Sequence, residues 1–429
     1  MGRRHHLFKL GIALTLGLGT LGLALFLAWS KLLPVFVFPA PGGPHAIGTL
    51  TYHLIDSDRT ETLNTDTNSR RELMVQIWYP AKPAAPAMPL TPPFGAPYVE
   101  NVEALAKALS LLMNLPAVLL RQFKHVTTHA VPGAPVADEK PNYPVLIFLQ
   151  GAIGFRQMNT FQVEALVSHG YIVVALDQPY TAAVVVFPDG REVAALALEQ
   201  MTRLIHQSHS PATIAPVLNG RPFDNGIVPH LAQDVSFTLN QLGAINQVDP
   251  NSILTGRLNL QNIGVFGISL GGIVASQACL LEPRLQACLF MDAPMPVDVA
   301  KFGLQQPALW ITRDIETMRL ERRRSGGWTE ADISEHQTSM HAAFNNSRGA
   351  RYFVQVAGMF HVNLTDVPFW SPLMPWLGIT GPIDAQRAHS IVNAYSLAFF
   401  NRHLLSRSEP LLEGLAQQYP EVVFNVRKP

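Results

Sequence analysis

The chain has 429 residues, and its 31 lysine and arginine side chains balance 31 aspartate and glutamate side chains, so the formal net charge is zero. A neutral chain gives no electrostatic support for a nucleic-acid partner. Apolar residues make up 48% of the sequence, which is enough for a large buried core. This length fits one enzyme domain with insertions as well as it fits two domains.

Residues 1–33 are predicted to form an N-terminal membrane anchor or signal segment. The stretch Leu10–Trp29 carries no charge, and about 20 such residues can cross a bilayer as a helix. Arg3, Arg4 and Lys9 precede this stretch. Their positive charge predicts an N-terminus in the cytoplasm and the remaining chain outside it, in the periplasm or the extracellular space.

A cleaved signal peptide is the alternative for the same segment. The apolar stretch is longer than the usual 7–15 residues of a signal peptide, and no clear small-x-small cleavage site ends it. An uncleaved anchor is therefore favoured, whereas cleavage would give a secreted protein. Residues 34–44 are rich in proline and glycine and are predicted to be a linker. Residues 45–429 then form the folded domain.

Apolar strands alternate with helical stretches along this domain. Continuous Val/Ile/Leu segments separated by helices are typical of a mostly parallel sheet covered on both faces, which is an α/β fold. The predicted strands are Glu72–Tyr79, Val145–Leu149, Tyr171–Leu176, Ile263–Phe266, Ala287–Met291, Ala308–Thr312 and Tyr352–Val356.

Two helical insertions are predicted, near residues 100–121 and 318–347. The first has an apolar stripe at helical spacing, so we expect a helix packed on the sheet, with a cap or membrane-facing helix as the alternative. The second is polar and is expected to be a solvated helical insert, with the basic residues 322–324 at the surface.

The turn between a predicted strand and a predicted helix carries Ser269. The segment Gly267–Gly271 matches G-x-S-x-G, in which a strained turn holds a serine hydroxyl clear of the sheet. The helix behind this turn offers free N–H groups and a positive dipole to a developing oxyanion. The sequence therefore predicts a nucleophile at Ser269, and a serine that only caps the helix is the alternative.

A candidate base is His361, in the segment Ala-Gly-Met-Phe-His after the last predicted strand. A histidine here could take the Ser269 proton and return it to a leaving group. Among the fifteen histidines it is the one at the carboxyl end of a late strand, and the others are expected to be solvated or to cap helices. A loop histidine without a catalytic role is the alternative.

The candidate acid is left open by the order of residues alone. Asp292 ends one predicted strand and Asp314 follows the next. Either gives the order serine, acid, histidine, and both meet Ser269 at the carboxyl edge of a parallel sheet.

Two backbone N–H groups are predicted to form the oxyanion hole. One belongs to Leu270, directly after the candidate nucleophile. The other belongs to Ala152, in the glycine-rich loop after the strand that ends at Leu149. The alternative is an ordinary glycine-rich loop between a strand and a helix.

The two cysteines, Cys279 and Cys288, fall in a predicted helix and a predicted strand. A buried pair of inert thiols is favoured over a redox site, with a structural disulfide outside the cytoplasm as the alternative. No Cys/His spacing typical of a metal site appears, so no metal and no cofactor are expected.

Six segments between Pro41 and Leu404 carry a resemblance to a known family. They are PGGPHAIGTLTYHLIDSDRTE, ELMVQIWYP, IFLQGAIGFRQMNTFQVEALVSHGYIVVALD, GISLGG, MDAPMP and GMFHVNLTD. The chain resembles the platelet-activating-factor acetylhydrolase family, in its plasma and type II branch with bacterial relatives. The resemblance implies the α/β-hydrolase fold and hydrolysis of esters with short or oxidised acyl chains, without calcium.

The resemblance also bears on individual site residues. Family members place the acid in a segment like MDAPMP, which assigns it to Asp292. It supports Ala152 and Leu270 as oxyanion donors and His361 as the base. The chain departs from the family at Gln150, where the family usually has histidine. A second departure is Ile268, also a common position for histidine. Both departures predict an altered acyl or leaving-group preference.

We therefore expect a serine carboxylic ester hydrolase that forms an acyl-enzyme on short-chain esters, including acetyl or oxidised-acyl phospholipids. The expected partners are a small ester or phospholipid substrate and a membrane contacted through the N-terminal helix, with no nucleic acid. The alternatives are an acyltransferase on the same fold, or an inactive membrane-anchored binding protein.

Overall fold

The computed structural model describes residues 35–66, 68–83, 95–114, 116–414 and 418–428. The predicted anchor at residues 1–33 lies outside these residues, so it stays a prediction. Across the described ranges, no helix is long and apolar enough to span a bilayer.

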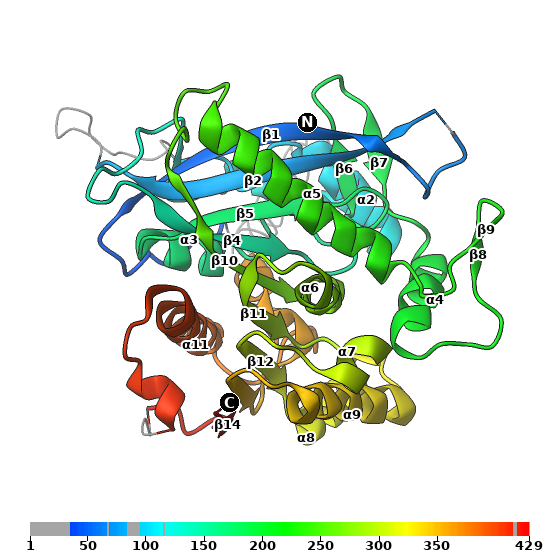
Figure 1. Ribbon diagram of the computed structural model, residues 1–429. Coiled ribbons are helices and arrows are strands. Elements are labelled where there is room, and N and C mark those ends of the chain that lie inside the picture. Colours follow the sequence, from blue (N-terminus) through cyan, green and yellow to red (C-terminus); the bar gives the residue numbers. More distant parts are fainter. Residues whose placement is uncertain (1–34, 67, 84–94, 115, 415–417, 429) are drawn as a thin grey trace, which may run out of the picture.

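A ten-stranded sheet forms the centre of the molecule, in the order β14-β13-β12-β11-β10-β4-β5-β2-β1-β3 (Figure 1). The six strands from β13 to β5 run parallel, whereas β14, β2 and β1 pair antiparallel. The strands are β1 (Ala46–Thr60), β2 (Arg70–Ala81), β3 (Ala130–Pro132), β4 (Tyr143–Leu149), β5 (Ile172–Asp177), β10 (Leu258–Ile268), β11 (Leu285–Met291), β12 (Ala308–Arg313), β13 (Arg351–Val356) and β14 (Val422–Arg427).

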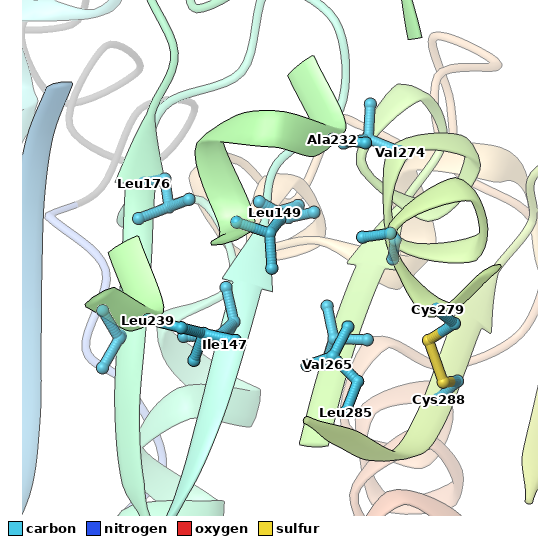
Figure 2. Packing of buried hydrophobic residues seen from close by; sticks show 14 of the residues in the cluster. Ile147, Leu149, Leu176, Ala232, Leu239, Val265, Val274, Cys279, Leu285 and Cys288 are labelled. Atoms are coloured by element: carbon cyan, nitrogen blue, oxygen red, sulfur yellow. A yellow bond between two sulfur atoms is a disulfide. The ribbon is translucent and has the colours of Figure 1, made fainter. Parts of the chain in front are cut away.

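Helices cover both faces of this sheet because its central strands are apolar on both faces. Along β4, Ile147 and Leu149 pack with one cluster, whereas Phe148 packs with the other. Figure 2 shows the first cluster, where Leu239 and Val274 approach the sheet. The helices on this face are α5 (Val228–Gln247), α6 (Leu270–Leu281), α7 (Val297–Phe302) and α9 (Glu330–Asn346), and those on the other are α3 (Thr160–Ser168) and α11 (Ala385–Leu405).

Further helices and two small hairpins complete the described part of the fold. The remaining helices are α2 (Val102–Met113), α4 (Leu198–His209), α8 (Ile315–Ser325), α10 (Val367–Trp370) and the 3-10 helices Ala117–Leu119, Arg121–His125, His361–Leu364 and Pro410–Glu413. Two small hairpins are formed by β6 (Val184–Val186) with β7 (Glu192–Ala194), and by β8 (Val217–Leu218) with β9 (Arg221–Pro222).

The helix α2 does not take the expected position on the sheet. It packs chiefly against the two following 3-10 helices and β6. Its buried residues Leu105 and Leu109 join an apolar cluster with Phe36, Phe38 and Trp370. The helix therefore lies beside the segment that was expected to be a linker, which buries two phenylalanines against the domain.

The second predicted insertion is less solvated than its polar sequence suggests. It forms α8 and α9, whose residues Met318, Ile333 and Met340 are buried. Apolar residues at helical spacing give α9 a buried face despite its many polar residues. The expectation of a solvated insert is therefore wrong for this face.

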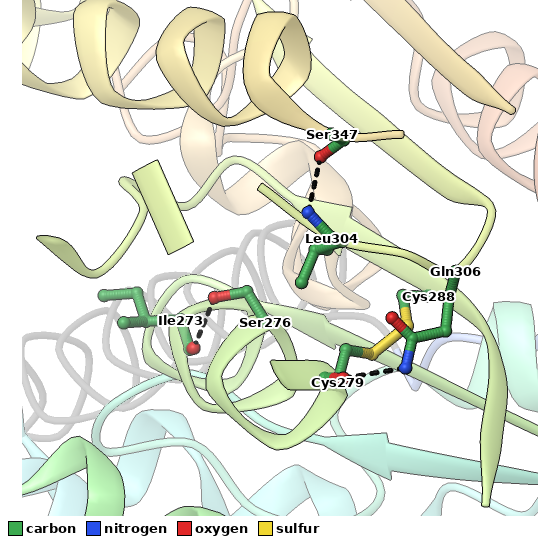
Figure 3. Close-up of a disulfide and its surroundings, with 7 residues drawn as sticks. All are labelled: Ile273, Ser276, Cys279, Cys288, Leu304, Gln306 and Ser347. Carbon is green, nitrogen blue, oxygen red and sulfur yellow. Dashed lines mark hydrogen bonds between the residues drawn. A yellow bond between two sulfur atoms is a disulfide. The ribbon is translucent and has the colours of Figure 1, made fainter. Parts of the chain in front are cut away.

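Cys279 and Cys288 form a disulfide (Figure 3). The bond joins α6 to β11, and Gln306 Nε2 donates a hydrogen bond of 2.8 Å to the Cys279 carbonyl oxygen. This corrects the favoured expectation of two inert thiols and bears out the disulfide of the alternative. The bridge fixes the helix after Ser269 to a strand of the central sheet.

Candidate active site

Ser269 occupies the sharp turn between β10 and α6. Its backbone has φ 54° and ψ −125°, a strained conformation for a residue with a side chain. The Ser269 N–H donates to the Met291 carbonyl oxygen at 2.9 Å, which anchors the turn to β11. A Cβ atom on Gly271 would collide with the backbone of Leu149, and one on Gly267 would collide with Gly271. The glycines of the motif therefore allow strand and helix to crowd at this turn.

The structure brings His361 together with Asp292. A hydrogen bond of 2.5 Å joins His361 Nδ1 to Asp292 Oδ2. Asp314, the other candidate acid, is the N-cap of α8 instead, and its carboxylate accepts hydrogen bonds from the Thr317 N–H at 2.8 Å and hydroxyl at 2.7 Å. The geometry therefore separates the two aspartates that the sequence left open.

Asp292 lies at the centre of a buried polar cluster. Its Oδ1 accepts hydrogen bonds from Thr312 Oγ1 at 2.7 Å and His336 Nε2 at 3.2 Å. Arg313 Nε forms an ion pair with Asp292 Oδ2 at 2.8 Å, and Arg313 also pairs with Glu321. Burial opposes the charge, but Arg313 and then His336 outweigh it and hold the pKa of Asp292 well below its usual range. The carboxylate thus stays ionised beside His361.

His336 and Arg313 were not predicted as site residues. His336 was expected to be solvated or to cap a helix like the other scattered histidines, yet it is only 1% exposed. Burial lowers its pKa, although Asp292 opposes this shift. Trp328 packs beside both, with its ring 5.6 Å from the His336 ring and 4.9 Å from the Arg313 guanidinium. The one sequence signal was a charged Arg313 at the end of a buried strand.

The predicted oxyanion donors both lie close to the candidate nucleophile, and Ala152, Ser269 and Leu270 line one cavity. A Cβ on Gly151 would approach the Ser269 Cβ to 3.2 Å, so the loop of Ala152 runs directly beside Ser269. Leu270 is the first residue of α6, and a helix leaves its first N–H groups without intrahelical acceptors. In the described part of the chain, no backbone carbonyl accepts from the N–H of Ala152 or Leu270. Both donors are therefore free for a ligand.

An apolar cavity of about 470 Å³ adjoins both Ser269 and His361. Among the hydrogen bonds of the described residues there is none between these two side chains, and such contacts often tighten only when substrate binds. The apolar wall comes from Leu109, Met113, Leu120, Met158, Ile268, Val362, Val367, Trp370, Leu373, Met374, Leu377 and Ile379. The cavity suits an apolar group attached to the reacting centre.

A second cavity, of about 380 Å³, also reaches Ser269. Its wall includes Leu270 and Trp328, but also the polar residues Thr202, His206, His209, Asp332, Glu335 and His336. Ser269 therefore stands between one apolar and one more polar cavity.

The fold and the serine turn together define the class. A mostly parallel sheet, a strand–serine–helix turn and a histidine after a late strand are the features of an α/β-hydrolase. Residues 34–411 match the family model of platelet-activating factor acetylhydrolase, isoform II. The chain belongs to this family and is an ester hydrolase of that type.

Individual relatives agree with this membership. Platelet-activating factor acetylhydrolase of Cavia porcellus is 22% identical over 394 residues, covering 85% of this chain and 78% of the relative. A probable 1-alkyl-2-acetylglycerophosphocholine esterase of Arthroderma benhamiae is 24% identical over 415 residues, covering 91% of this chain and 94% of the relative. Among solved structures, a ferulic acid esterase from Streptomyces cinnamoneus matches with a TM-score of 0.66 and 28% identity, covering 91% of this chain and 99% of that chain.

Proposed function

We propose that the protein is a serine carboxylic ester hydrolase that works through an acyl-enzyme at Ser269. The observation that carries the proposal is the His361–Asp292 hydrogen bond, formed next to a strained serine turn around one cavity. His361 is the general base, Asp292 holds its ring in the productive tautomer, and the N–H groups of Ala152 and Leu270 form the oxyanion hole.

The reaction follows from these positions. The Ser269 hydroxyl attacks the ester carbonyl while His361 takes its proton, and the two backbone N–H groups stabilise the oxyanion. Collapse of the tetrahedral intermediate breaks the ester bond, and His361 gives its proton to the departing alkoxide. Water then attacks the acyl carbonyl while His361 takes its proton. The second tetrahedral intermediate collapses, the bond between Ser269 Oγ and the acyl group breaks, and His361 returns its proton to Ser269 as the acid leaves.

The substrate class is a short-chain ester with an apolar leaving group. His361 must reach the leaving oxygen to protonate it, and His361 lines the apolar cavity. An alkyl chain on the alcohol side therefore fits this cavity, while the acyl group stays short. Acetyl or oxidised-acyl phospholipids meet this description, and two of the relatives are named for acetyl-ester substrates.

The site is proposed to lie outside the cytoplasm, held by an N-terminal membrane helix. The charge bias of the first residues and the uncharged stretch Leu10–Trp29 support this placement. The disulfide between Cys279 and Cys288 supports it independently, because structural disulfides persist mainly in oxidising compartments.

Hydrolysis of p-nitrophenyl acetate by matched serine variants tests the proposal. Ser269→Ala should lose several orders of magnitude in kcat without loss of the folded state. Ser276→Ala is the control, because Ser276 lies on α6, the helix that follows the Ser269 turn, and its buried hydroxyl donates to the Ile273 carbonyl oxygen instead of facing the cavity. Near-wild-type turnover by Ser269→Ala would remove Ser269 as the nucleophile.

Acyl-chain preference is tested separately with acetyl, butyryl and decanoyl esters of one alcohol. We expect kcat/KM to be highest at the short chains. A maximum at the decanoyl ester would contradict the short-acyl part of the proposal while leaving the esterase part in place.

A further inference from the structure

A cluster of metal-ligating side chains lies in the wall of the more polar cavity. The donor atoms of His206, His209 and Glu335 lie within 4.8 Å of one another. Within the residues that the structure describes, this is the one group of three such side chains. Nothing in the proposed ester hydrolysis uses these residues.

Two elements position the three ligands. His206 and His209 are three residues apart on α4, a spacing that places both imidazoles on one face of a helix. Their ring centroids are 4.5 Å apart. Glu335 comes from α9, and its Oε1 forms a hydrogen bond of 2.8 Å with His209 Nδ1. The sequence concealed this group because the carboxylate comes 126 residues after His209.

The surroundings of the cluster favour a cation. In the described ranges, no lysine or arginine forms an ion pair with Glu335. The similar His53–Glu72 pair differs, because Arg191 lies 2.9 Å from the Glu72 carboxylate and already supplies a positive charge. A second carboxylate, Asp332, lines the same cavity as the cluster.

The donor types select the kind of ion. Two imidazole nitrogens and one carboxylate oxygen suit Zn²⁺ and related transition metals, whereas Ca²⁺ and Mg²⁺ prefer oxygen ligands alone. Zn²⁺ holds such donors at about 2.0–2.2 Å, so small side-chain rotations would bring the three atoms onto one ion. The cavity leaves room for a further ligand such as water.

We propose that His206, His209 and Glu335 bind one divalent transition-metal ion of the Zn²⁺ type. The ion links α4 to α9 in the wall of the cavity that reaches Ser269. Since α9 also carries His336, the ion fixes the helix that contacts the Asp292 carboxylate.

Titration calorimetry of the metal-free full chain with ZnCl₂ tests the proposal. We expect one site per chain, and at least about tenfold weaker binding in His209→Ala and in Glu335→Gln. Glu335→Gln preserves the shape of the side chain, so it still tests the proposal if His209→Ala fails to fold. His53→Ala is the matched control from the similar His–Glu pair, and its affinity should equal that of the wild type.

Two further measurements make the result independent of activity. Co²⁺ should give the visible absorption of a protein-bound ion in the wild type and not in a His206→Ala/His209→Ala double variant. Ser269→Ala should bind Zn²⁺ as the wild type does, so failure of the esterase proposal would not affect the outcome. Unchanged Zn²⁺ affinity in the double variant, or equal competition by Ca²⁺, would overturn the proposal.

Discussion

Replacing Asp292 by asparagine should nearly abolish turnover, because its carboxylate fixes the His361 ring. The 2.5 Å bond to His361 Nδ1 requires an acceptor, and an asparagine side chain can present its NH₂ group there instead. Substitutions that leave the wrong tautomer cost about 10⁴ in kcat in a serine hydrolase. This corresponds to about 5 kcal/mol in the activation free energy.

The same substitution should also lower stability. Arg313 is fully buried and would keep only Glu321 as a carboxylate partner. Breaking a buried ion pair costs about 3–5 kcal/mol, and the remaining Glu321 contact should hold the loss near or below that range. Thermal unfolding must therefore accompany the kinetics, so that kcat is compared only between folded enzymes.

Asp314→Asn is the matched control, since it makes the same change at the neighbouring candidate. Asparagine caps helices about as well as aspartate, so α8 should stay intact. We expect less than about a tenfold change in kcat, because Asp314 does not touch His361. The assay is kcat on p-nitrophenyl acetate for both variants. If Asp314→Asn were the crippled enzyme, the assignment of the acid to Asp292 would be refuted.

Three further predictions concern charge, cavity and disulfide. Arg313→Met should raise the pKa of Asp292, because burial would act without the opposing positive charge of Arg313. A carboxyl group with a lowered pKa in the folded state stabilises the fold at pH values above its ordinary pKa of about 3.9, and this stabilisation is lost as the pH falls through the folded-state pKa. The acid limb of the kcat/KM profile and acid unfolding should therefore both move to higher pH, and coincidence with the wild-type curves would contradict this. Met113→Trp should narrow the apolar cavity and lower kcat/KM by about tenfold for esters with long alkyl alcohols while sparing p-nitrophenyl acetate. Leu111→Trp, on the same helix but 77% exposed and outside the cavity wall, should change neither, and equal effects of the two variants would dismiss the cavity as the leaving-group site. Removing the disulfide with the double substitution Cys279→Ala and Cys288→Ala should lower the free energy of unfolding by about 2–3 kcal/mol. The reason is that the unfolded chain regains the entropy lost by closing a loop between cysteines nine residues apart. An unchanged free energy of unfolding in urea would contradict this prediction.

The parallel core of the fold was predictable because its strands are continuous apolar segments. All seven predicted strands overlap observed ones, and the clear case is Val145–Leu149 within β4. The long strand β1, which lies between β2 and the short edge strand β3, was missed. Its outer half exposes Ile55 and Ser57 and carries several charged residues, so its apolar pattern is weak. Its pairing with β2, rather than its own sequence, holds it in the sheet.

The site was predictable only where local sequence determines geometry. Ser269 was found because glycines must flank such a turn, and the resemblance pointed to Asp292 before the structure paired it with His361. His336 could not be found in this way. It comes from a polar helix 44 residues after Asp292, and only tertiary packing brings the two together.

The central claim is that Ser269 is the nucleophile of this ester hydrolase, and covalent labelling tests it most directly. The full chain is treated with a fluorophosphonate, digested, and the labelled peptide is sequenced by mass spectrometry. We expect one adduct per chain, on the peptide that carries Ser269, and no adduct in Ser269→Ala. An adduct on another serine, or equal labelling of Ser269→Ala, would contradict the claim.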